Sequence, residues 1–329
     1  MTVIAAVSLF DGVMLIADSR VTFTSQGRRD YHCDIAQKIL PLTANIALAF
    51  SGDVRVAAIL LPNLIRHMKR RGRLGTVSLL QWFPRFLKAT FRQIRAKLAD
   101  GRSYDQIQFI IAAIIPDRTN VVDRGRVADI LRRAMSPDAS MQRTWFPDVV
   151  MRVLMTPAEI THVPIPGAPA VVLGVMRSPD FALERFAPLS CVAIGSGHGA
   201  VVEMERTADW LFANDADMYI KIGLEAAVQD FVAQNDVDSV GGMYPCVKID
   251  RRGLAYLGGI YQFPLYEVAL TVEPKTKRWI QENRTTGKKQ PLLWPWEIVK
   301  SNPRAGRRFD DYRQAAEHFN PRRGKRQRP

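Results

Sequence analysis

The chain opens with two apolar runs separated by a tight-turn signal, and this pattern restricts the fold more than any other feature. Residues 3–10 and 13–17 flank Asp11-Gly12, a dipeptide typical of two-residue β-hairpin loops. A second pair of strand-like runs, residues 38–42 and 46–50, follows across a short turn. The sequence therefore predicts two β-hairpins in succession at the start of the protein.

Two helices are predicted next, over residues 53–71 and 76–99, because apolar side chains recur there at intervals of three and four. Pro62 and Pro84 fall inside these segments, where proline is expected to interrupt a helix. Residues 108–115 then have the continuous apolar character of a buried strand.

The second half of the chain repeats this alternation of strands and helices. After a partly helical insertion at about residues 117–152, the apolar runs predict strands over residues 149–155 and 189–194, helices over residues 200–212 and 218–233, and strands over residues 244–249 and 254–260. This order suits two sheets packed face to face between helical layers better than a doubly wound parallel sheet. The expected fold class is α+β.

The positive charge is concentrated at the C-terminal end. The chain of 329 residues has a net charge of +14, and residues 275–329 hold 16 Lys+Arg against 5 Asp+Glu, which is +11. Residues 1–274 hold 30 against 27 and are nearly neutral. The Pro, Gly and Arg content of residues 301–308 and 320–329 predicts a linker and a free end. A short amphipathic helix is expected between them, over residues 309–319.

The composition sets the class of protein. A content of 47% hydrophobic residues indicates a folded chain. No apolar run is long enough to span a membrane, and no secretory signal is evident, so we expect a cytoplasmic protein without a membrane partner. The three cysteines, Cys33, Cys191 and Cys246, have neither the number nor the spacing of a disulfide framework or a zinc site. The five histidines show no ligand spacing, so no metal or cofactor is expected.

Thr2 is the most consequential position for chemistry. Removal of the initiator methionine would leave a residue that carries a nucleophilic hydroxyl and its own base, the α-amine. A nearby lysine, held by a carboxylate, would shift that amine toward its free-base form. Asp18 and Lys38 lie next to predicted strands that could flank Thr2. Gly52, where a strand passes into a helix, could offer an unobstructed backbone N–H to an oxyanion.

These residues carry a family resemblance. The segments concerned are Thr2 itself, ADSR at 17–20, QKI around Lys38, FSGD at 50–53, AIGSG at 193–197 and DVDSVGG at 236–242. Together they resemble the signature of proteasome β-subunits, which are N-terminal-nucleophile (Ntn) hydrolases. The lack of a propeptide before Thr2 is similar to the simple bacterial members, including the ancestral β-subunit type.

The resemblance implies a four-layer αββα sandwich over residues 2–265. Residues 266–329, which have no counterpart in the family, are expected from their composition to form a basic, partly disordered extension. The resemblance also implies site roles: Thr2 as nucleophile, Asp18 and Lys38 as an ion pair, Gly52 as oxyanion donor, Ser196 beside the nucleophile, and Asp236 with Ser239 as supporting residues. Asp238 is an alternative to Asp236. The implied substrate is a peptide or unfolded protein, and the implied assembly is a homo-oligomeric ring or helical array. An ATPase or adaptor partner is left open.

Three other readings remain open. An amidase acting on a small non-peptide substrate would use the same fold, because a fold does not set the substrate. The body could instead be a catalytically silent scaffold whose basic tail, with Trp279, Trp294 and Trp296, binds nucleic acid or an acidic partner. For that tail, packing on a neighbouring subunit is the favoured interpretation. The glycines of residues 195–200 also fit a dinucleotide fingerprint, but a helix follows where that motif needs a strand.

Overall fold

The predicted opening hairpin forms around Asp11-Gly12 and provides the two central strands of a sheet. In this computed structural model, β1 (Val3–Ser8) and β2 (Gly12–Ala17) pair antiparallel. Both strands are buried along their whole length, which explains their continuous apolar sequence. The structure describes residues 2–23, 31–71, 75–97, 106–134, 147–213, 219–235, 240–263 and 266–301.

Two five-stranded antiparallel sheets form the centre of the molecule. The first has the order β10-β1-β2-β11-β12 and the second the order β5-β6-β7-β8-β9. The remaining strands of the first sheet are β10 (Cys191–Gly195), β11 (Cys246–Asp250) and β12 (Gly253–Leu257). The second sheet consists of β5 (Ile39–Thr43), β6 (Ile46–Gly52), β7 (Ile107–Asp123), β8 (His162–Arg177) and β9 (Glu184–Phe186).

Alternating side chains of the second sheet belong to two different cores. Along β7, Ile110 and Ala112 point into the core shared with the first sheet, whereas Phe109 and Ile111 pack with the helices on the other side. This is the two-residue period of a strand buried on both faces. The two sheets contact each other through β1 and β2 on one side and β7 and β8 on the other.

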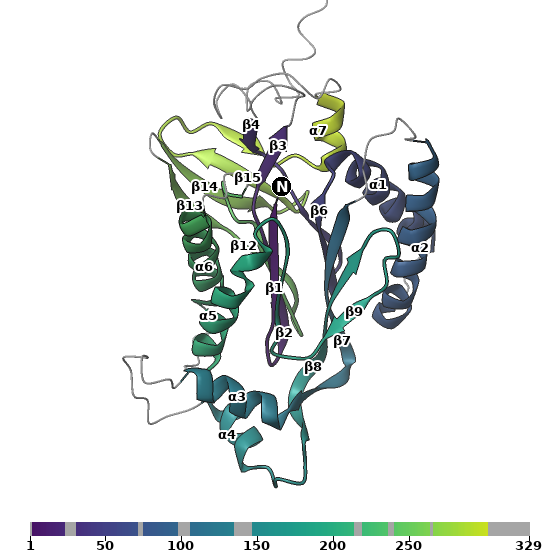
Figure 1. Cartoon of the computed structure of the whole chain (residues 1–329). Coiled ribbons are helices and arrows are strands. Elements are labelled where there is room, and N and C mark those ends of the chain that lie inside the picture. Colours follow the sequence, from purple (N-terminus) through teal and green to yellow (C-terminus); the bar gives the residue numbers. More distant parts are fainter. Residues whose placement is uncertain are drawn as a thin grey trace, which may run out of the picture.

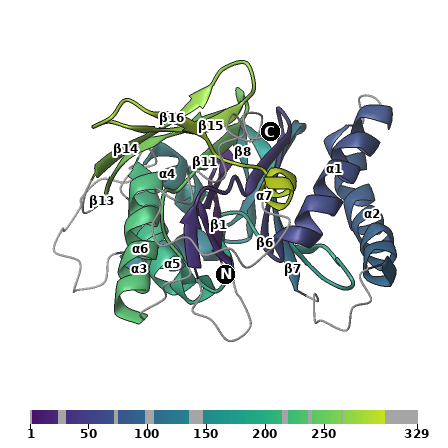
Figure 2. The ribbon, with the colours of Figure 1, turned by 90° about the horizontal axis from the view of Figure 1, so that it is seen from above.

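A pair of helices lies outside each sheet (Figures 1 and 2). On one side α1 (Val54–Arg71) and α2 (Thr76–Lys97) pack on the second sheet. On the other side a single 3-10 turn, η1 (His198–Ala200), leads into α5 (Val201–Ala213), which is followed by α6 (Ile220–Asn235). All four helices were expected, and the α+β class is confirmed.

Pro62 and Pro84 lie inside α1 and α2 without ending them, contrary to the prediction. The buried face of each helix packs along the sheet through residues on both sides of its proline. Such tertiary packing offsets the loss of one backbone hydrogen bond.

The segment between β7 and β8 differs from the prediction. The long strand β7 continues to Asp123, so the start of the expected insertion is strand rather than helix. Two helices follow, α3 (Arg124–Ala134) and α4 (Asp148–Met155). The prediction of a strand over residues 149–155 was wrong, since these residues belong to α4. A short apolar run is compatible with a buried strand and with the buried face of a helix. Val150 and Val153, three residues apart, form the buried face of α4.

The chain beyond residue 265 also differs from the expected extension, because residues 266–301 are folded. β13 (Gly259–Phe263) pairs with β14 (Tyr266–Glu273), and β15 (Arg278–Asn283) and β16 (Lys289–Pro291) complete a four-stranded sheet. The expected domain boundary at residue 265 thus falls between β13 and β14, two strands that pair with each other. The short helix α7 (Pro295–Ser301) contacts α1. The helix predicted over residues 309–319, and nearly all of the predicted linker and free end around it, lie outside the described residues.

One further hairpin, β3 (Arg20–Phe23) with β4 (Tyr31–Asp34), follows β2 directly and lies near the N-terminal end of β1 (Figure 1). Within the described ranges, no helix has the length and apolar content needed to cross a membrane.

Candidate active site

The antiparallel pairing of β1 and β2 brings Thr2 and Asp18 together. Thr2 precedes β1 and Asp18 follows β2, and in the register Ile4 lies opposite Ala17. The Asp18 backbone N–H donates to the Val3 carbonyl at 3.1 Å, and the Val3 N–H donates to the Asp18 carboxylate Oδ1 at 2.9 Å. The aspartate is therefore fixed by the backbone on both sides of the strand end.

Lys38 connects the carboxylate to the threonine hydroxyl. It lies just before β5, and its Nζ contacts three oxygens: Thr2 Oγ1 at 2.5 Å, Asp18 Oδ1 at 2.8 Å and the Arg20 carbonyl at 2.5 Å. These contacts join residues that are 18 to 36 positions apart in the sequence. The three residues predicted as nucleophile and ion pair are thus adjacent in space.

The site is almost completely enclosed. The exposed fraction is 5% for Thr2, 0% for Asp18 and 2% for Lys38. Burial raises the pKa of Asp18, although the adjacent Lys38 opposes the shift. Burial also lowers the pKa of Lys38, and here the contact with Asp18 is the opposing effect. Both shifts favour the neutral forms, and a lysine in this setting can act as a proton acceptor.

Ser196 lies on the other side of Thr2. The Thr2 backbone nitrogen donates to Ser196 Oγ at 3.1 Å, and the Gly197 N–H donates to the Thr2 carbonyl at 3.5 Å. Glycine at 195 is required sterically, since an added Cβ would lie 1.9 Å from the Thr2 carbonyl oxygen and 2.7 Å from Ser51 Oγ. Its φ of +90° also favours glycine.

Gly52 ends β6, the strand that runs beside Lys38. The Phe50 N–H, two residues earlier, donates to the Lys38 carbonyl at 3.2 Å. Gly52 is exposed and has a φ of +117°. An added Cβ there would lie 1.9 Å from the Gln106 carbonyl oxygen, so a side chain is excluded.

A layer of polar contacts behind the site was only partly anticipated. Arg20, whose carbonyl accepts from Lys38, forms an ion pair with Asp34 at 2.8 Å and donates to the Val240 carbonyl at 3.3 Å. Asp34 had not been singled out. The Arg20–Asp34 register of β3 and β4 brings the two together, but the intervening residues gave no clear hairpin signal.

Ser19 and Gly242 tie this layer to the chain after α6. Ser19 and Met243 exchange two hydrogen bonds, at 2.8 and 2.9 Å. Gly242, at a φ of +79°, lies so close that an added Cβ would be 2.6 Å from both Asp34 Cγ and Ser19 Oγ. Gly242 belongs to the 236–242 segment that resembles the family signature. The other predicted residues of that segment, Asp236, Asp238 and Ser239, lie outside the described residues.

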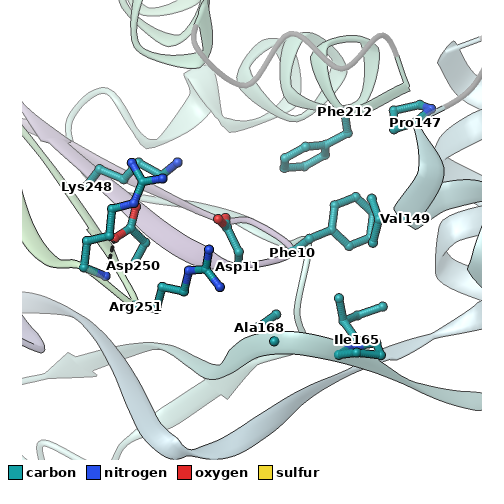
Figure 3. Close-up of a pocket in the computed structure, with 13 residues that line it drawn as sticks. Phe10, Asp11, Pro147, Val149, Ile165, Ala168, Phe212, Lys248, Asp250 and Arg251 are labelled. Carbon is teal, nitrogen blue, oxygen red and sulfur yellow. Dashed lines mark hydrogen bonds between the residues drawn. The ribbon is translucent and has the colours of Figure 1, made fainter.

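A cavity of about 410 Å³ occurs at the other end of the β1–β2 hairpin, not at Thr2 (Figure 3). The six residues of β1 separate the two ends by about 20 Å. The cavity is apolar on one side, with Phe10 and Phe212, and charged on the other, where Arg251 lies near Asp11 and Lys248 also lines the wall (Figure 3). Because its cations are mixed with carboxylates, the cavity shows no marked preference for one charge.

The described residues contain no group of three or more His, Cys, Asp or Glu placed to bind a metal. Burial raises the pKa of all three cysteine thiols, that of Cys33 to about 12, so they are poor nucleophiles. What the Thr2 site can offer chemically is a hydroxyl in contact with a buried lysine, that is, nucleophilic attack assisted by proton transfer.

Comparison with known proteins assigns no family. No family model matches the chain, and no curated protein matches it. Among solved structures the chain is similar to Anbu (ancestral beta-subunit) from Yersinia bercovieri, with 10% identity, a TM-score of 0.47, and coverage of 77% of this chain and 86% of that one. This likeness identifies no activity, so the function is argued from the site itself.

Proposed function

We propose that this protein is an N-terminal threonine hydrolase, built on a four-layer αββα Ntn-type fold, that cleaves peptide bonds through an acyl-enzyme. The observation that carries the proposal is the position of Lys38 Nζ between Thr2 Oγ1 and Asp18 Oδ1 in a site where none of the three residues is more than 5% exposed. A buried lysine held against a hydroxyl by a carboxylate is the arrangement that activates a weak nucleophile.

The contacts of Lys38 suggest how the proton moves. The Arg20 carbonyl can only accept hydrogen bonds, and so can Asp18 when ionised, so two amine hydrogens are directed to these oxygens. The third contact is with Thr2 Oγ1, which can also donate. A neutral Lys38 therefore has its lone pair available for the threonine proton, and the lowered pKa of Lys38 makes this form accessible.

The reaction needs Met1 to be removed, which frees the α-amine of Thr2. Oγ1 attacks the carbonyl carbon, its proton passes to Lys38, and the Gly52 N–H stabilises the resulting oxyanion. Lys38 passes this proton on through the neutral α-amine, which is held by Ser196, to the leaving nitrogen as the C–N bond breaks. Water attacks the ester by the reverse proton route and regenerates the free hydroxyl.

Intact mass measured with and without a threonine-directed epoxyketone tests the proposal. We expect loss of Met1 and a single covalent adduct that Thr2→Ala abolishes. Thr2→Ser, which keeps the hydroxyl, should retain the adduct, while Thr22→Ala is a control at a threonine outside the site. Retention of Met1 in the folded protein would contradict the proposal. Turnover of small amides without peptide cleavage would favour an amidase instead.

A further inference from the structure

The near-neutral body contains a strongly cationic segment. Residues 54–97, which include α1, α2 and their connection, hold eleven Lys+Arg and no Asp or Glu. The rest of residues 1–274 hold 19 Lys+Arg and 27 Asp+Glu. The neutrality of the body is thus the sum of a cationic helical hairpin and a remainder of net charge −8.

The cations of this hairpin lie on its outer face. On α2, Arg85, Lys88, Arg92 and Arg95 recur at intervals of three and four, which places them along one stripe. The opposite face, including Phe83, Leu87 and Phe91, is buried against the second sheet. Seven cationic side chains of the two helices are exposed: Arg55, Arg66, Lys69, Arg70, Arg85, Arg92 and Arg95. Figure 2 shows α2 at the outer edge of the molecule.

Little negative charge compensates this face. Among the described residues, Arg55 pairs with Asp53 and Lys88 with Asp180. No ion pair joins Lys69, Arg70 or Arg85 to a described residue, while Arg92 interacts electrostatically with Asp180. A surface on which the exposed cations outnumber the nearby carboxylates Asp53 and Asp180 attracts a polyanion in any register along it.

The dimensions and chemistry of the face favour nucleic acid. The 22 residues of α2 span about 33 Å, a length over which a DNA duplex presents roughly 20 phosphate charges. Six of the seven exposed cations are arginines, whose planar fork matches phosphate oxygens. An aromatic cluster of His67, Trp82 and Phe86 lies between the two helices, with His67 exposed.

A membrane surface fits less well. Helices that lie on lipid insert large apolar or aromatic side chains. Among the described residues of α1 and α2, Ile59 is the one strongly exposed large hydrophobic, at 39%. The face therefore lacks the apolar component that lipid binding needs.

We propose that the outer face of the α1–α2 hairpin binds the phosphate backbone of nucleic acid. This binding does not depend on the base sequence. The outer face is separate from the Thr2 site, and the proposal does not depend on the proposed hydrolase activity.

Fluorescence anisotropy of the full-length protein with a labelled 20-base-pair duplex tests the proposal. In the triple variant Arg70→Gln, Arg85→Gln and Arg92→Gln we expect at least a tenfold weaker affinity at low salt. The slope of the logarithm of the association constant against the logarithm of the salt concentration is negative, and its magnitude should fall by about 2.7, because each lost phosphate contact removes roughly 0.9. Glutamine is a good helix former, so an unchanged melting temperature should show that the fold is retained.

Two matched variants, each lacking three arginines, serve as controls. Arg118→Gln, Arg152→Gln and Arg185→Gln remove exposed charges away from the hairpin and should leave the affinity within about threefold. The second variant, Arg322→Gln, Arg323→Gln and Arg326→Gln, tests the C-terminal tail. If the tail variant abolishes binding while the hairpin variant does not, the proposal is wrong. The proposal would also be overturned if anionic vesicles or polyglutamate bound to the hairpin as tightly as the duplex or more tightly.

Discussion

Lys38 Nζ lies 2.8 Å from Asp18 Oδ1, and the two side chains are 2% and 0% exposed. A buried ion pair is costly to desolvate, and removing one partner leaves an uncompensated buried charge. The pair therefore makes separable contributions to stability and to chemistry, because Lys38 also contacts the Thr2 hydroxyl.

Asp18→Asn should affect both properties. We expect the free energy of unfolding to fall by about 3 to 5 kcal/mol, since Lys38 loses its buried partner. Turnover should fall about 100-fold or more, because the Lys38 side-chain amine is no longer held against the Thr2 hydroxyl. Denaturant unfolding and steady-state kinetics measure the two effects. Asp53→Asn breaks an ion pair whose Arg55 side chain is 45% exposed and should change stability by under about 0.5 kcal/mol. Equal effects of the two variants would contradict the buried-pair argument.

The lowered pKa of Lys38 sets the pH dependence. If neutral Lys38 accepts the threonine proton, kcat should rise with pH through a midpoint below the ordinary lysine value of 10.5. In the same window the unfolded chain binds the proton that folded Lys38 has released, so this group's contribution to stability rises with pH. Above 10.5 both states are deprotonated at Lys38, and the rise ends.

A pH–rate profile of the wild type and of Lys38→Arg checks this. Arginine keeps its proton across the whole range, so Lys38→Arg should show no ascending limb and only residual turnover. An ascending limb of unchanged midpoint in Lys38→Arg would assign the titration to another group.

Gly195→Ala should displace Thr2. The new methyl group would overlap the Thr2 carbonyl oxygen and approach Ser51 Oγ, at a φ that disfavours alanine. We expect a loss of about 2 to 4 kcal/mol in stability and more than tenfold in kcat. Gly75→Ala is the matched control, because nothing lies within 4 Å of its added Cβ. It should change stability by under about 1 kcal/mol, and similar losses at both positions would rule out the steric explanation.

Arg20→Gln should loosen the backbone behind Lys38 without removing a reacting group. Arg20 is anchored by Asp34 and the Val240 carbonyl, and its own carbonyl accepts from Lys38. We expect kcat, counted per molecule that reacts with the epoxyketone, to fall about tenfold with KM nearly unchanged. Counting only reactive enzyme separates this effect from a loss of folded protein. Arg284→Gln, which breaks the more exposed pair with Glu267, is the control and should leave both constants unchanged.

The candidate site was predictable from the sequence because its residues stand at strand ends. Thr2 and Asp18 flank a hairpin whose turn is fixed by Asp11-Gly12, so their adjacency follows from register alone. Lys38 was placed by its position at the start of the next predicted strand and by the family resemblance of the QKI segment around it. Asp34 was missed, because its contact with Arg20 depends on a hairpin whose strands are only four residues long.

The rest of the fold was harder to predict where local signals conflict with packing. β8 contains Pro164, Pro166 and Pro169, residues that argue against a strand, yet it pairs with β7 over most of its length and shifts register close to Pro169. The basic composition after residue 274 predicted an exposed tail. The strands β14 and β15 carry charged side chains at their exposed positions, and these made the segment look like a polar tail. The buried residues at alternate positions, such as Val268 and Leu270, were therefore overlooked.

Trp279 provides the test of whether residues 266–301 belong to the folded body. Its side chain is fully buried, lies edge-on to Tyr256 of β12 with ring centroids 5.1 Å apart, and belongs to the core shared by the two central sheets. Trp279→Ala should therefore lower the free energy of unfolding by about 3 to 5 kcal/mol, measured by denaturant titration. Tyr219→Ala, at a side chain that is 53% exposed, should cost under about 1 kcal/mol. A small effect of Trp279→Ala would mean that this sheet is a separate extension, as the charge distribution first suggested.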